Sequence, residues 1–98
     1  MKTHCALLRL AHNRNDIDAV IDIFEENKCA IREAIRHWVG RRQTRNWAEC
    51  YVMLYIASVC QRYDPLQHDP TEWIAVAATE ACNSMRLEIK TRKREQAK

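Results

Sequence analysis

The chain has 98 residues, which is enough for one domain with one modest hydrophobic core. It contains a single glycine and two prolines, so a glycine-rich phosphate loop is excluded and helix-forming residues dominate. Its mean hydropathy of −0.53 argues against a membrane protein, and the expected fold class is all-α.

The five cysteines include neither a Cys-x-x-Cys pair nor a Cys/His pair at zinc-finger spacing. The N-terminal residues lead directly into the first expected helix without a signal peptide, so a cytoplasmic location is expected. We therefore expect reduced, buried thiols, no disulfide scaffold, no metal site and no cofactor. The cysteines are Cys5, Cys29, Cys50, Cys60 and Cys82.

Positive charge is concentrated at the C-terminal end. Residues 83–98 carry six basic and two acidic side chains, a net charge of +4, so the other 82 residues sum to −1 within a total of +3. This asymmetry indicates an anionic partner for the segment. Its last part, residues 90–98, is polar and basic and is expected to fray.

Apolar periodicity predicts a short first helix followed by three longer ones. The first covers residues 5–12. The second runs from about Asp16 to Val39, with a cap at Asn15 or Asp16 and with Gly40 as the residue that stops it. Its buried stripe is expected to be Ile17, Val20, Ile21, Phe24, Ile31, Ile35 and Trp38.

The third helix, residues 46–63, is apolar on most of its sides, which is typical of a helix at the centre of a small domain. Asn46 is its expected cap, with Glu49 in the capping-box position. Pro65 ends this helix, because the residue before a proline disfavours helical geometry.

The fourth helix has a complete start signal after the expected loop, residues 64–69. Asp69 is the cap, Pro70 takes the first helical position and Glu72 completes the capping box. No internal repeat or second domain is visible, so residues 1–98 are interpreted as a single domain. The buried stripe of this helix is expected to be Trp73, Ile74, Ala77, Ala78, Ala81, Met85 and Ile89.

No catalytic set is visible, so an enzyme is not expected. The histidines at positions 4, 12, 37 and 68 fall on different elements, and no serine or cysteine has a base at helical spacing. The basic end is interpreted either as a solubilising tail or as a contact to a nucleic-acid backbone. Aromatic groups beside a cationic surface suit unstacked bases, and Tyr63, His68 and Trp73 flank the loop. Taken alone, Trp73 also fits a core position.

Three stretches of the chain carry a resemblance to a known family. They are CALLRLAHNRNDIDAVIDIFEEN at residues 5–27, HWVG at 37–40 and RYDPLQHDPTEWIAVAATEACNSMRLEIKTRKR at 62–94. Their order resembles region 2 of bacterial sigma factors of the sigma-70 family, extracytoplasmic-function type. The stretches are similar to the family's first two helices, its exit loop and its promoter-reading helix. The family's region-4 helix-turn-helix module has no counterpart in residues 1–98.

The resemblance implies a sigma-region-2-like domain that takes part in transcription initiation as a binding module. Its expected partners are RNA polymerase core, through the clamp helices of the largest subunit, and the single-stranded −10 element of promoter DNA. The implied polymerase-binding residues are Asn46, Trp47, Glu49 and Cys50. The implied DNA-binding residues are Tyr63, Asp64, Gln67, His68, Trp73, Arg86, Lys90, Arg92, Lys93 and Arg94.

Val76, Thr79 and Glu80 stand where the family usually has Arg and Asn. An alternative is therefore a degenerate sigma-like domain that binds protein, such as an anti-sigma factor or a copy of itself. An unrelated small helical enzyme or ligand-binding protein is a more distant alternative. The DNA-binding domain and the degenerate domain differ in what surrounds Glu80. In the degenerate domain an ion pair of Glu80 with Arg86 or Lys90 would replace a DNA contact.

Overall fold

The computed structural model describes residues 2–38 and 45–96, with the backbone alone for 45, 46, 89 and 91–96. Within these residues every regular element is helical, so the all-α prediction is confirmed. The predicted end of the second helix, at Val39 and Gly40, lies outside the described residues. The elements are α1 (Lys2–His12), α2 (Ile17–Trp38), α3 (Arg45–Val59), the short 3-10 helix η1 (Cys60–Arg62) and α4 (Pro70–Gln96).

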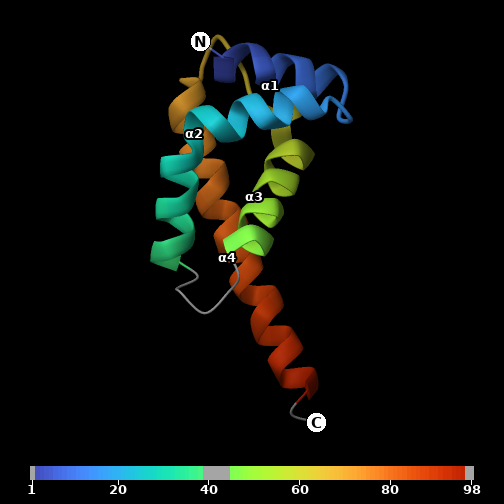
Figure 1. The fold of residues 1–98 in the computed structure, drawn as a ribbon, viewed down its shortest axis with the longest axis vertical. Helices are drawn as coiled ribbons and strands as arrows, with labels where there is room; N and C mark the ends of the chain where they lie inside the picture. The colour runs from blue at the N-terminus through green and yellow to red at the C-terminus, as the bar shows by residue number, and fades with distance from the viewer. Residues whose placement is uncertain (1, 39–44, 97–98) are drawn as a thin grey trace.

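The helices pack in the spatial order α1, α2, α4 and α3, with extensive contacts between each neighbouring pair (Figure 1). α1 lies along the first half of α2, and α2 then changes direction and continues beside α4. α3 and α4 run in opposite directions and pack together, joined by η1 and the loop of residues 64–69. The last turns of α4 extend beyond the other helices, and the molecule is elongated, with extents of 47 × 24 × 23 Å.

A buried polar link joins α1 to the middle of α2. Asn27 donates from Nδ2 to Thr3 Oγ1 and to the Ile23 carbonyl, both at 2.8 Å, and Thr3 Oγ1 donates to Glu26 Oε1 at 2.8 Å. Because each buried polar group is satisfied, the link stabilises the packing of α1 on α2. A side chain that bonds to the carbonyl four residues earlier is one cause of helix bending, and α2 changes direction near its middle.

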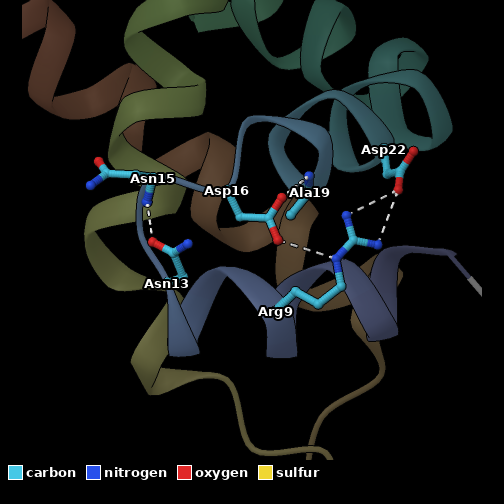
Figure 2. Close-up of polar contacts among 6 residues, drawn as sticks. All are labelled: Arg9, Asn13, Asn15, Asp16, Ala19 and Asp22. Atoms are coloured by element: carbon cyan, nitrogen blue, oxygen red, sulfur yellow. Dashed lines mark hydrogen bonds and ion pairs between the residues drawn. The ribbon is translucent and has the colours of Figure 1, made fainter.

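The turn between α1 and α2 is held by charged side chains (Figure 2). Asp16 Oδ1 accepts a bond from the Ala19 N–H at 3.0 Å, which confirms Asp16 as the cap of α2. The Arg9 guanidinium lies 3.4 Å from Asp16 Oδ2 and 3.4 Å from Asp22 Oδ2. The bond from Ala19, followed by Arg9, lowers the pKa of Asp16.

The predicted buried stripe of α2 is only partly correct. Ile31 and Ile35 are buried, whereas Ile17 is 71% exposed and Ile21 is 46% exposed. α1 packs against the face that carries Ala19 and leaves Ile17 and Ile21 on an outer side. The packing of α1 on α2, rather than the apolar periodicity alone, determines which face of α2 is buried.

The prediction that the third helix occupies the centre is wrong. α2 packs against all three other α-helices, while α3 packs mainly against α2 and α4. Leu54 of α3 is 72% exposed, and Cys50 and Ser58 are also exposed. The last turn of the predicted helix is the separate η1.

The predicted stripe of α4 is confirmed for most of its residues. Ile74, the three alanines and Met85 are buried, Trp73 is half-buried, and the Ile89 side chain lies outside the described residues. Within the described residues, no helix is both long and apolar enough to cross a membrane.

The prediction of buried thiols is correct for two cysteines only. Burial raises the pKa of Cys60 and of Cys82. Cys5, Cys29 and Cys50 are exposed, because each lies on the outer side of its helix.

Candidate nucleic-acid interface

The loop of residues 64–69 is closed by bonds that converge on Asp64. The Asp64 carboxylate accepts from the Leu66 N–H at 2.9 Å, and its carbonyl accepts from the His68 N–H at 2.9 Å. In return, the Asp64 N–H donates to His68 Nδ1 at 2.9 Å. The loop is therefore held by its own backbone and side chains, and Leu66 at its tip is 94% exposed.

The end of the loop is also the start of α4. Asp69 Oδ2 accepts from the Glu72 N–H at 3.0 Å, and the Asp69 carbonyl accepts from the Trp73 N–H at 2.9 Å. Asp69 is thus the N-cap and Pro70 the first helical residue, as predicted. The cap sets the position of the loop relative to the helix axis.

An aromatic cluster lies beneath the loop, with Tyr63 at its centre. The Tyr63 ring is 6.1 Å from the His68 ring and 5.7 Å from the Trp73 ring, measured between centroids. Its hydroxyl is 2.8 Å from His4 Nδ1 of α1. Tyr63 is only 7% exposed, so it supports the ring of His68 and offers no open face to a base. Burial, followed by the charges of Asp69 and Asp64, raises its pKa.

Glu80 lies in the seam between α3 and α4. The Tyr55 hydroxyl donates to Glu80 Oε2 at 3.0 Å, so Glu80 is not placed between Arg86 and Lys90. Burial, followed by this bond and the charge of Glu80, raises the pKa of Tyr55. Beside this contact lies a hollow of about 90 Å³ lined by Val59, Arg62, Trp73, Val76, Ala77 and Glu80.

A second tyrosine of α3 pairs with a second glutamate of α4 in the same way. Burial raises the pKa of Tyr51, and the charge of Glu88 and a hydrogen bond with Glu88 raise it further. Glu80 and Glu88 of α4 thus both interact with tyrosines of α3. Arg86 and Lys90 are exposed, and neither forms an ion pair with any described residue.

The structure does not bring all predicted DNA-binding residues onto one face. Arg86 and Lys90 follow Trp73 by 13 and 17 residues, which places them about 140° and 100° away around α4 at 3.6 residues per turn. Asp64, Gln67 and His68 are together in the loop. The side chains of Arg92, Lys93 and Arg94 lie outside the described residues.

The same helical spacing adds one residue that sequence reasoning missed. Asn83 lies three residues before Arg86 and seven before Lys90, so the three share one exposed face. Thr79, half-buried, begins this face and donates back to the Ala75 carbonyl at 3.1 Å. The periodicity alone could have identified this polar and cationic strip.

The predicted polymerase-binding residues at the start of α3 have three different surroundings. Trp47 is half-buried, with its ring 5.7 Å from that of Tyr51, and Cys50 is exposed. The Glu49 side chain is 12% exposed and its Oε1 lies 2.7 Å from Arg32 Nε of α2. Glu49 is thus paired with α2, and α3 begins at Arg45, one residue before the predicted cap. The Asn46 side chain lies outside the described residues.

Arg32 is a partner that local sequence patterns could not reveal, because it lies 17 residues before Glu49. Its guanidinium also lies 5.7 Å from the centroid of the Phe24 ring, in cation–π geometry.

Among the described residues, no group of three or more His, Cys, Asp or Glu side chains is placed to hold a metal ion. No protein-family model, curated protein or solved structure matches the chain.

Proposed function

We propose that this chain is a sigma-region-2-like binding module. In this proposal the loop of residues 64–69 and α4 bind the single-stranded −10 element of promoter DNA, and the first turns of α3 bind RNA polymerase core. The proposal includes no catalytic step. It rests on the residue pattern of the three stretches and on the charge distribution of α4.

The charge distribution is the observation that carries the proposal. Glu80 and Glu88 are engaged by the tyrosines of α3, whereas Arg86 and Lys90 have no acidic partner among the described residues. A phosphate backbone that binds the outer face of α4 displaces counterions and breaks no internal ion pair. The loop adds Gln67 and His68, both exposed, as groups able to contact a base.

The separation of the loop and the cationic strip sets a minimum length for the DNA. Arg86 and Lys90 lie about 20 and 25 Å from Trp73 along the helix axis, at the rise of an α-helix. At about 3.4 Å per nucleotide of a stacked strand, about seven to eight nucleotides are needed to contact both regions. Such a strand has to cross α4, because the two regions occupy different faces.

The experiment is a competition at fixed salt between a single strand with a −10-like sequence, its duplex, a scrambled single strand and a strand shorter than about seven nucleotides. We expect the intact single strand to bind most tightly, because its bases are already unpaired. The short strand should lose affinity, since it cannot reach both regions. If the duplex competes equally well and scrambling has no effect, base reading by the loop is wrong.

The polymerase contact needs a different variant, because Glu49 is paired. Glu49→Arg alone removes the contact with Arg32, so it lowers stability together with any binding. The double variant Arg32→Glu/Glu49→Arg restores an ion pair with reversed polarity. We expect it to regain the melting temperature without regaining affinity for purified RNA polymerase core. Recovery of both would show that Glu49 only holds α2 against α3.

A protein-binding domain without DNA reading is the second candidate. The observation in its favour is the hollow, whose lining includes Val76, 59% exposed, and the carboxylate of Glu80. The lining is mostly apolar and carries both an acidic and a basic group, Glu80 and Arg62, a composition that suits a protein side chain better than a phosphate. Val76→Lys separates the two candidates: it strengthens DNA binding if this part of α4 faces DNA. If the hollow faces a protein such as a second copy of the chain, DNA binding does not change and self-association, measured by analytical ultracentrifugation, weakens.

A further inference from the structure

The turn at residues 64–68 determines which ring nitrogen of His68 carries a proton. The backbone N–H of Asp64 points at His68 Nδ1 over 2.9 Å. An N–H donor requires a lone pair on its acceptor, so Nδ1 is unprotonated. A neutral imidazole then carries its proton on Nε2, and that nitrogen is a hydrogen-bond donor.

The ring of His68 is supported on one side and open on the other. The Tyr63 ring lies beneath it at a centroid distance of 6.1 Å and an interplanar angle of 30°. Tyr63 is in turn held by His4 and Trp73, so the support is rigid. His68 is exposed, and within the described part of the chain Nε2 has no hydrogen-bond partner.

We propose that His68 is a specificity-determining residue that donates one hydrogen bond from Nε2 to a bound nucleobase. The site then favours a base that presents a carbonyl oxygen, such as uracil or thymine, over cytosine, which presents an amino group at the equivalent position. An amino group facing Nε2–H brings two donors together and leaves both unpaired. This inference rests on the proposed binding of single-stranded DNA.

Two substitutions of His68 test the roles of its two ring nitrogens one at a time. In His68→Asn the side-chain oxygen takes the place of Nδ1 and accepts from Asp64, but no donor remains at the position of Nε2. In His68→Gln the amide nitrogen reaches the position of Nε2, but the acceptor for Asp64 is lost. His37→Asn is the matched control, because His37 is exposed on α2, away from the loop.

The first measurement is made on the free, full-length protein labelled with 15N in its histidines. The ring nitrogen shifts of His68 should show the proton on Nε2. The second measurement compares single strands that differ only by uracil or cytosine, with the variable base moved through the −10-like sequence. We expect a preference of about fivefold for uracil at one position, the worth of one neutral hydrogen bond.

The three variants should differ in how much of the preference for uracil they retain. His68→Asn should lose it with little change in melting temperature, His68→Gln should retain part of it, and His37→Asn should match the unmodified protein. A proton on Nδ1, or a preference that survives in His68→Asn, overturns the inference. Equal binding of the two strands by the unmodified protein overturns it too and leaves the proposed single-strand binding intact. Failure to bind any single strand overturns the proposed function, and the base preference with it.

Discussion

Two turns of this domain start a helix in the same way and differ in what they leave exposed. In the turn before α2, Asp16 caps the helix and Asn13 Oδ1 accepts from the Asn15 N–H at 3.1 Å (Figure 2). Arg9 of α1 then contacts both Asp16 and Asp22. The negative charge of this turn is therefore used to hold two helices together.

The loop before α4 repeats both hydrogen-bond motifs with other partners. Asp69 caps the helix, and the Asp64 carboxylate accepts from Leu66 two residues on. No basic side chain among the described residues bonds to either carboxylate. His68 closes the loop instead, and its ring stays exposed.

The comparison shows that the same local chemistry serves two purposes, depending on what packs against it. A turn with an ion pair to a neighbouring helix becomes a structural joint. A turn closed by its own groups leaves side chains available to a ligand. The two turns should therefore respond differently to matched substitutions.

The largest difference is expected for leucine truncations in the two regions. Leu10 of α1 is fully buried, so Leu10→Ala should lower the free energy of unfolding by about 2 to 5 kcal/mol. Leu66 is 94% exposed, so Leu66→Ala should change it by less than about 0.5 kcal/mol. Urea unfolding of the two variants measures both values. Similar losses would show that the loop is part of the core after all.

The two caps should differ less, and in a way that depends on the replacement. Asp69→Ala should cost about 1 kcal/mol, and Asp69→Asn should be nearly neutral, because asparagine also caps helices. Asp16→Ala should cost more than Asp69→Ala, since the contact with Arg9 is lost as well. Asp16→Asn keeps the cap and should still lower the melting temperature. Equal behaviour of the two asparagine variants would contradict a structural role for the ion pair.

Acid should weaken the joint between α1 and α2. The pKa of Asp16 is lowered from 3.8, chiefly by the Ala19 N–H, and that of Glu26 is lowered from 4.5, chiefly by its bond with Thr3. A carboxyl whose pKa is lower in the folded protein stabilises it above the unfolded value and loses that contribution as the pH falls. Urea midpoints should therefore fall below about pH 4.5, and the fall should be shallower in Asp16→Asn. A slope that is the same in both proteins would exclude Asp16 as a contributor.

The smallest effect on stability is expected for the cations of α4. Replacing Arg86 and Lys90 together by Gln should leave the melting temperature unchanged, because neither has an acidic partner among the described residues. The salt dependence of single-strand binding should flatten by about 0.7 per lost phosphate contact. Arg9→Gln is the matched control, and it should lower stability without changing that slope. An unchanged slope in the double variant would assign the cations to solubility.

Local patterns were sufficient where the interaction itself is local. The caps at Asp16 and Asp69 bond to N–H groups three residues on, so the residue types alone predict them. The buried stripe of α4 follows from a 3.6-residue period whose polar residues leave one apolar side. The all-α class follows from composition in the same way.

The sequence by itself thus determined the all-α class and the starts of α2 and α4, because these starts depend on bonds within a few residues. Only the tertiary structure decided which side of α2 is buried, because that depends on the face against which α1 packs. It also paired Glu49 with Arg32, Glu80 with Tyr55 and Tyr63 with His4, across 17, 25 and 59 residues. No periodicity predicts such contacts, since they arise when helices far apart in the chain pack together. These long-range contacts also determine which side chains of the candidate site are held as supports and which remain exposed to a partner.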